Sequence, residues 1–127
     1  MACGSGPARH RAVGDYGERV AARHLEALGM TVVDRNWRCD QGEIDVVAPT
    51  SPPTLVVCEV KTRTSVSYGS PVEQVTHRKA MRLRRLAVRW LQEHPDVTSP
   101  HVRVDVVGVL VPRAGAPEVE HVVGVLS

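Results

Sequence analysis

Three valine-rich segments, at residues 43–48, 55–63 and 101–111, constrain the fold most strongly. Their β-branched residues and their alternation of apolar with polar positions are typical of β-strands whose two faces have unlike surroundings. The first two are separated only by a Pro- and Ser-containing stretch at 49–54, which predicts a hairpin. A chain patterned in this way is predicted to build its core around a β-sheet.

Two other segments carry the helical period of about 3.6 residues. They cover about 15–28 and about 71–93, and Pro95 ends the second of them. Weaker strand-like segments lie at 30–37 and 119–126. The predicted order of elements is therefore α-β-β-β-α-β-β, which is an α/β arrangement without internal repeats.

The size and composition of the chain fit one domain. It has 127 residues, of which 43% are hydrophobic and 24% charged, close to the average of globular proteins. Residues 1–13 mix Gly, Pro, Ala, Arg and His without periodicity and are expected to form a disordered basic tail. Residues 14–127 are expected to form the single domain.

Several classes of protein are excluded by simple patterns. The chain has no run of about 18 apolar residues and no apolar block behind its first charges, so neither a membrane span nor a secretory signal is predicted. Its three cysteines are widely separated, which gives no support to a disulfide framework or a structural zinc site. A cytoplasmic location is expected.

Charge is concentrated in the second helix, although the formal net charge of the chain is only +2. Six basic residues occur there with no acid between them: Arg78, Lys79, Arg82, Arg84, Arg85 and Arg89. Four of these arginines follow helical spacing on one face. That face is either an ordinary solvated surface or a contact for phosphate groups of a nucleic acid.

The predicted hairpin carries charged residues two positions apart on otherwise apolar strands. Glu43 and Asp45 share one strand face, as do Glu59 and Lys61. A register that places Asp45 opposite Glu59 brings two carboxylates to within roughly 5 Å of each other. Like charges so placed are stabilised by a cation between them, and Mg²⁺ suits one or two carboxylates.

A register shifted by two residues gives a different interpretation. It places Asp45 opposite Lys61 and makes an ordinary cross-strand salt bridge on a solvated face. The spacing of the residues alone does not decide between these two alternatives.

Several spaced motifs, in this order along the chain, resemble the YraN family, also called UPF0102. The resemblance covers about 15–111. Its motifs are Gly14-Asp15-Tyr16-Gly17-Glu18, Asn36-Trp37-Arg38, Gly42-Glu43-Ile44-Asp45-Val46-Val47, Val57-Cys58-Glu59-Val60-Lys61-Thr62-Arg63, Val72-Glu73-Gln74-Val75 with Lys79, and Val102-Arg103-Val104-Asp105-Val106-Val107.

This family is similar to the PD-(D/E)XK nuclease superfamily. Within that superfamily, the proteins that the family resembles most are archaeal Holliday-junction resolvases. The resemblance implies a restriction-endonuclease-like three-layer fold, with a mixed central sheet flanked by helices. Ile44 stands where the superfamily motif has proline, but its side chain points to the opposite face from the aspartate that follows.

The same resemblance implies roles for individual residues. Asp45, Glu59 and Glu18 match the acids that hold Mg²⁺ or Mn²⁺, with the Val60 carbonyl as a further ligand, and Lys61 matches the motif lysine. The metal would polarise the scissile phosphate and Lys61 would orient the attacking water or neutralise charge. Glu18 has an alternative role as the capping-box partner of Asp15 at the start of the first helix.

The expected function is metal-dependent hydrolysis of phosphodiester bonds in structured or branched DNA, in recombination, repair or DNA processing. The alternative is a non-catalytic nucleic-acid-binding or assembly protein that retains the nuclease fold. Duplex or branched DNA and a homodimer are the expected partners, with no membrane. The expected DNA contacts are Arg63, Gln74, Arg78, Lys79, Arg82, Arg85 and Arg89.

Overall fold

The computed structural model describes residues 4–5, 12–50, 53–64 and 75–126. Within these residues the chain forms, in order, β1 (Gly4–Ser5), α1 (Ala12–Ala27), β2 (Asp34–Cys39), β3 (Gly42–Pro49), β4 (Thr54–Arg63), α2 (His77–Glu93), β5 (His101–Leu110) and β6 (Glu118–Val122). The predicted order α-β-β-β-α-β-β is confirmed from α1 to β6.

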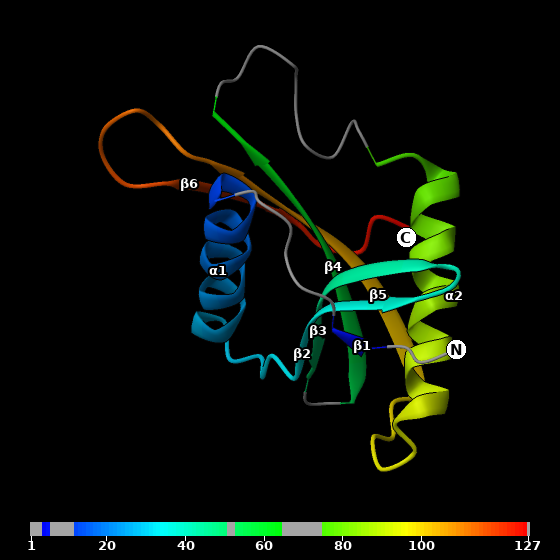
Figure 1. Ribbon diagram of the computed structural model, residues 1–127. Coiled ribbons are helices and arrows are strands. Elements are labelled where there is room, and N and C mark those ends of the chain that lie inside the picture. Colours follow the sequence, from blue (N-terminus) through cyan, green and yellow to red (C-terminus); the bar gives the residue numbers. More distant parts are fainter. Residues whose placement is uncertain (1–3, 6–11, 51–52, 65–74, 127) are drawn as a thin grey trace.

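The strands form one mixed sheet in which their spatial order follows the chain, from β1 to β6. Only β4 and β5 are parallel, and every other neighbouring pair is antiparallel. A parallel pair needs a crossover connection, and α2 lies in the segment that joins these two strands. Figure 1 shows α1 and α2 on either side of the sheet.

Each helix covers its own apolar core. Under α2, Leu83, Leu86 and Trp90 pack against Trp37 and Leu55 of the sheet. Under α1, the smaller second cluster contains Ala21, Leu25, Val46, Cys58, Val107 and Val109. Because apolar residues are buried on both faces of the sheet, β4 and β5 are rich in valine throughout their central residues.

Several element boundaries differ from the sequence-based predictions. β2 covers Asp34–Cys39 rather than 30–37, and β6 covers Glu118–Val122 rather than 119–126. α1 begins at Ala12 rather than at Asp15, and Gly4–Ser5, predicted to be unstructured, pair with β2. α2 begins at His77, because the Thr76 hydroxyl caps it by accepting a hydrogen bond from the Lys79 N–H at 3.2 Å. Pro71, the predicted start, lies outside the described residues.

Gly17 allows α1 to approach β4 very closely. A side chain at this position would overlap the side chain of Thr62, so only a hydrogen at the Cα fits. This contact sets the position of the next residue, Glu18, relative to the end of β4.

Neither described helix has the length and apolar character needed to cross a membrane.

Candidate functional site

The register of the β3–β4 hairpin places the two predicted acids against each other. The observed partners include Val46 with Cys58 and Val47 with Val57. Continued by one residue, this register sets Asp45 opposite Glu59. The alternative register, with Asp45 opposite Lys61, is therefore wrong.

The ladder between β3 and β4 ends beside Asp45. Val46–Cys58 is the last pair on this side, and the Val60 N–H instead donates a hydrogen bond to the Asp45 carboxylate at 2.9 Å. Burial, and after it the neighbouring charge of Glu59, raise the pKa of Asp45 to about 7. Asp45 thus lies in surroundings that disfavour its charged form.

Glu59 is almost fully buried but has two lysines as partners. Lys61 Nζ lies 3.2 Å and Lys79 Nζ 2.8 Å from the same oxygen, Oε2. Lys61 comes from the same strand face, as the sequence predicted, whereas Lys79 reaches in from the first turn of α2. The hydrogen bond to Glu59 is the main cause that raises the pKa of Lys79. The two ammonium groups therefore compensate Glu59, while Asp45 has a second carboxylate as its neighbour.

Glu18 joins the site from α1. The side chain of Asn36 on β2 hydrogen-bonds its carboxylate, and Arg35 Nη2 lies 3.9 Å from Oε1. That Oε1 atom is buried and has no hydrogen-bond partner among the described residues. Burial raises the pKa of Glu18 despite both of these contacts.

These residues surround a pocket of about 940 Å³ at one end of the sheet. The first turns of α1 form one wall, and residues of β2, β3 and β4 form the rest. At its rim, Arg38 Nε donates a hydrogen bond to Glu43 Oε2 at 2.9 Å. The pocket brings together Glu18, Asn36, Asp45, Glu59 and Lys61.

The donor atoms of the pocket suit a hard divalent cation. Within the described part of the chain, no three His, Cys, Asp or Glu side chains are arranged as a ready metal site. However, Mg²⁺ needs only one or two carboxylates when waters and phosphate oxygens complete its shell. The Oε1 atom of Glu18, which accepts no hydrogen bond within the described residues, and the carboxylate of Asp45, which lies beside Glu59, are oxygen donors that such an ion would satisfy.

The predicted DNA contacts are divided by the fold. Arg78, Arg82 and Arg85 are exposed on α2, whereas Arg89 pairs with Asp40 at 3.1 Å and with Glu93 at 3.1 Å. Arg63 ends β4 and is not among the residues that line the pocket. Gln74 lies outside the described residues. Lys79 is the residue of this set that reaches a pocket residue, through Glu59.

Sequence reasoning did not single out Asn36 as a functional residue. The asparagine stood only within a motif of the family resemblance, and nothing in the spacing of its neighbours indicated a pocket position. Its contact with Glu18 depends on how α1 packs against the sheet. A polar residue directly before a buried tryptophan in a strand was the one available signal.

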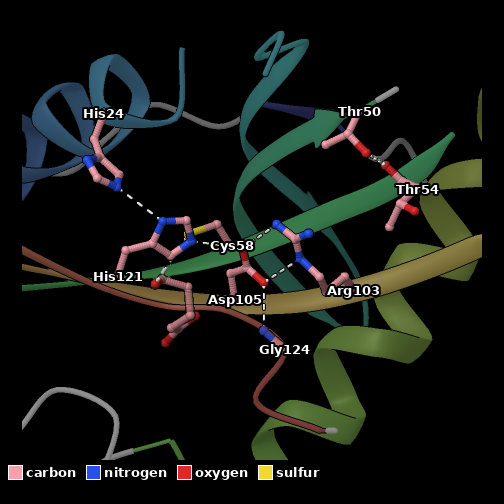
Figure 2. A network of polar contacts seen from close by, with 9 residues as sticks. His24, Thr50, Thr54, Cys58, Arg103, Asp105, His121 and Gly124 are labelled. Atoms are coloured by element: carbon pink, nitrogen blue, oxygen red, sulfur yellow. Dashed lines mark hydrogen bonds and ion pairs between the residues drawn. The ribbon is translucent and has the colours of Figure 1, made fainter. Parts of the chain in front are cut away.

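A second polar cluster surrounds Asp105, whose side chain is fully buried on β5 (Figure 2). Arg103 donates two hydrogen bonds to it, at 3.0 and 2.9 Å, and the Gly124 N–H donates one at 3.0 Å. His121 Nε2 lies 2.8 Å from Asp105, and His121 Nδ1 lies 3.1 Å from Nε2 of His24 on α1. None of these five residues lines the pocket.

The comparisons with known proteins agree on one family. Residues 17–109 match the family described as "Uncharacterised protein family UPF0102". A UPF0102 protein of Kineococcus radiotolerans is 61% identical over 114 residues, covering 90% of this chain and 93% of the relative. A UPF0102 protein of Nocardioides sp. is 50% identical over 125 residues, covering 98% of this chain and 99% of the relative. The matched region contains every residue of the pocket from Glu18 to Thr62.

Proposed function

The chain belongs to the UPF0102 family, and we propose that its pocket is the active site of a Mg²⁺- or Mn²⁺-dependent endonuclease that hydrolyses phosphodiester bonds in structured or branched DNA. The observation that carries this proposal is that the carboxylates of Asp45 and Glu59 are neighbours where the β3–β4 ladder ends, with Lys61 in contact with Glu59. A restriction-endonuclease-like fold is part of the same proposal.

The acids of the pocket would hold the cation. Asp45 and Glu59 offer carboxylates from neighbouring strands, and Glu18 offers a third carboxylate from α1. A divalent cation supplies Lewis-acid chemistry, because it polarises a phosphoryl oxygen and lowers the pKa of water. Its charge would also relieve the repulsion between Asp45 and Glu59.

The lysines act on the phosphate. When a cation compensates Glu59, the Nζ groups of Lys61 and Lys79 become available to donate hydrogen bonds to phosphate oxygens. An ammonium group at this place stabilises negative charge that develops on the phosphate during hydrolysis. Lys61 would in addition orient the attacking water, since it lies on the same strand face as Glu59.

The arginines of α2 bind the DNA backbone in this proposal. Arg78, Arg82 and Arg85 are exposed, and the first turn of the helix that carries them contains Lys79, which is in contact with Glu59. Guanidinium groups contact phosphates without reading the base sequence. Replacing Arg82 and Arg85 by Gln is expected to weaken binding to every DNA sequence and to flatten its dependence on salt.

Cleavage assays test the proposal directly. Labelled linear, flapped and four-way DNA would be incubated with the protein in Mg²⁺, in Mn²⁺ or in EDTA, beside Asp45→Asn and the exposed control Asp96→Asn. We expect cleavage that needs metal, that is unchanged in the control, and that falls at least about 1,000-fold in Asp45→Asn. Equal cleavage by Asp45→Asn and the wild type would contradict the proposal.

A second candidate function is binding of nucleic acid without turnover, in an assembly that retains this fold. The observation in its favour is that Lys61 and Lys79 both pair with the same oxygen of Glu59 and compensate its charge. This alternative predicts salt-sensitive DNA binding that EDTA does not change, and no cleavage of any substrate shape.

A further inference from the structure

Asn36 has an unusual backbone conformation for a residue inside a strand. It lies in the middle of β2 with a φ of 53°, in the left-handed region. Among the described residues it is the one non-glycine residue with a positive φ. Asparagine adopts this conformation more readily than most residues, so the side chain and the backbone at this position are matched.

The alternation of side chains changes at this point on two strands at once. On β2, Arg35 reaches Glu18 of α1, whereas Trp37 packs in the core under α2. On β3, Val46 packs under α1, whereas Ile44 packs under α2. Residues two apart on a regular strand share a face, so each strand has shifted by one residue between these positions.

Asn36 and Asp45 are the residues at which the two strands shift. The observed pairs on either side, Arg35 with Val46 and Trp37 with Ile44, leave these two facing each other without a ladder pair of their own. Both residues line the pocket. The interruption of the sheet therefore directs one amide and one carboxylate into the same cavity.

The amide of Asn36 also fixes a third group. It hydrogen-bonds the carboxylate of Glu18, whose Oε1 has no hydrogen-bond partner within the described residues. Glu18 thus lines the same pocket as Asp45 and Glu59, with one carboxylate oxygen that accepts no hydrogen bond within the described residues.

We propose that Asn36 is a positioning residue, whose left-handed backbone and side-chain amide hold the Glu18 carboxylate in place for a divalent cation shared with Asp45 and Glu59. This inference rests on the proposed function of the pocket. Partners that orient a ligand in this way commonly affect metal affinity by about 10–100-fold.

The experiment measures Mn²⁺ affinity of the full chain by isothermal titration calorimetry. Asn36→Gly removes the amide but still permits a positive φ, so the fold is expected to remain while Mn²⁺ affinity falls about 10-fold or more. Asn36→Ala is expected to lose the same affinity and also thermal stability, because alanine does not favour this φ. Gln41→Gly, in the exposed turn after β2, is the matched control and should bind Mn²⁺ like the wild type.

A double-mutant cycle shows whether Asn36 acts through Glu18. In the Glu18→Gln background, Asn36→Gly is expected to cause little further loss of Mn²⁺ affinity. Unchanged affinity in Asn36→Gly, or an equal fold-loss with and without the Glu18 carboxylate, would overturn the inference while the proposed function stands. A wild-type protein that binds no Mn²⁺ and cleaves no DNA would overturn the proposed function and this inference with it.

Discussion

Asp45 and Asp105 are aspartates on two strands of one sheet, but their surroundings are opposite. The carboxylate of Asp105 is enclosed by four hydrogen-bond contacts, two of them from the guanidinium of Arg103. The carboxylate of Asp45 receives one hydrogen bond within the described residues, from the Val60 N–H, and lies beside Glu59. The first site is electrostatically complete, and the second is not.

This difference teaches which carboxylate serves the fold and which is available for a ligand. A buried charge with a full set of partners fixes the elements around it, and here Asp105 ties β5 to β6 and to Gly124. A carboxylate held next to another one destabilises the folded chain unless a cation binds. Natural proteins commonly retain such a cost where a site is functional.

The largest effect on stability is expected at Asp105. Asp105→Ala would leave Arg103, His121 and the Gly124 N–H without their acceptor, which typically costs about 3–5 kcal/mol of unfolding free energy. Urea denaturation measures this loss, with Asp96→Ala at an exposed position as the control. A loss below about 1 kcal/mol would remove the contrast between the two aspartates.

Replacing Asp45 is expected to have the reverse effect, an increase in the free energy of unfolding. Its raised pKa means that, between about pH 4 and pH 7, the folded chain holds a proton that the unfolded chain has released. Wild-type stability therefore falls as the pH rises through this window, and Asp45→Asn lacks this loss. The variant should be more stable than the wild type by about 2–4 kcal/mol at pH 8 and nearly equal at pH 4.

Urea denaturation of both proteins across this pH range, without divalent cations, measures the difference. If the difference in unfolding free energy between the two proteins is as large at pH 4 as at pH 8, protonation of Asp45 is not its cause.

A smaller loss of stability is expected from a substitution where α1 packs against β4. Gly17→Ala would force the helix away from Thr62, at a cost of about 1–3 kcal/mol. Removing the opposing atoms by Thr62→Ala should recover part of this loss, since the two positions are in contact. Thermal unfolding of the two single variants and the double variant measures the coupling, and strictly additive losses would contradict the close approach.

The hairpin could be predicted from the sequence because its information is local. Alternation of apolar and polar residues over 43–48 and 55–63 located the strands. The charged residues two positions apart indicated which strand face carries the candidate site. The pairing of Val46 with Cys58 then confirmed the register that sets Asp45 opposite Glu59. The family, inferred from motifs in the right order, is also confirmed.

Features that depend on packing between distant segments could not be predicted. Lys79 reaches Glu59 only because Thr76 starts α2 at that point, and the sequence had favoured an earlier start. Arg89 was expected at a DNA surface but is held by Asp40 of the β2–β3 turn, far away in the sequence. The left-handed conformation of Asn36 likewise has no signature in hydrophobic periodicity.

Paramagnetic broadening by Mn²⁺ in the amide NMR spectrum tests most directly whether the Asp45 site is the one completed by a cation. We predict that substoichiometric Mn²⁺ broadens the signals of Asp45, Glu59 and Val60 and leaves sharp those of Asp96, beyond the C-terminal end of α2, and of His101, at the far end of β5. We also predict that Asp45→Asn abolishes the effect. Signals around Asp45 that stay sharp, or that broaden equally in Asp45→Asn, would contradict a cation site at this end of the sheet.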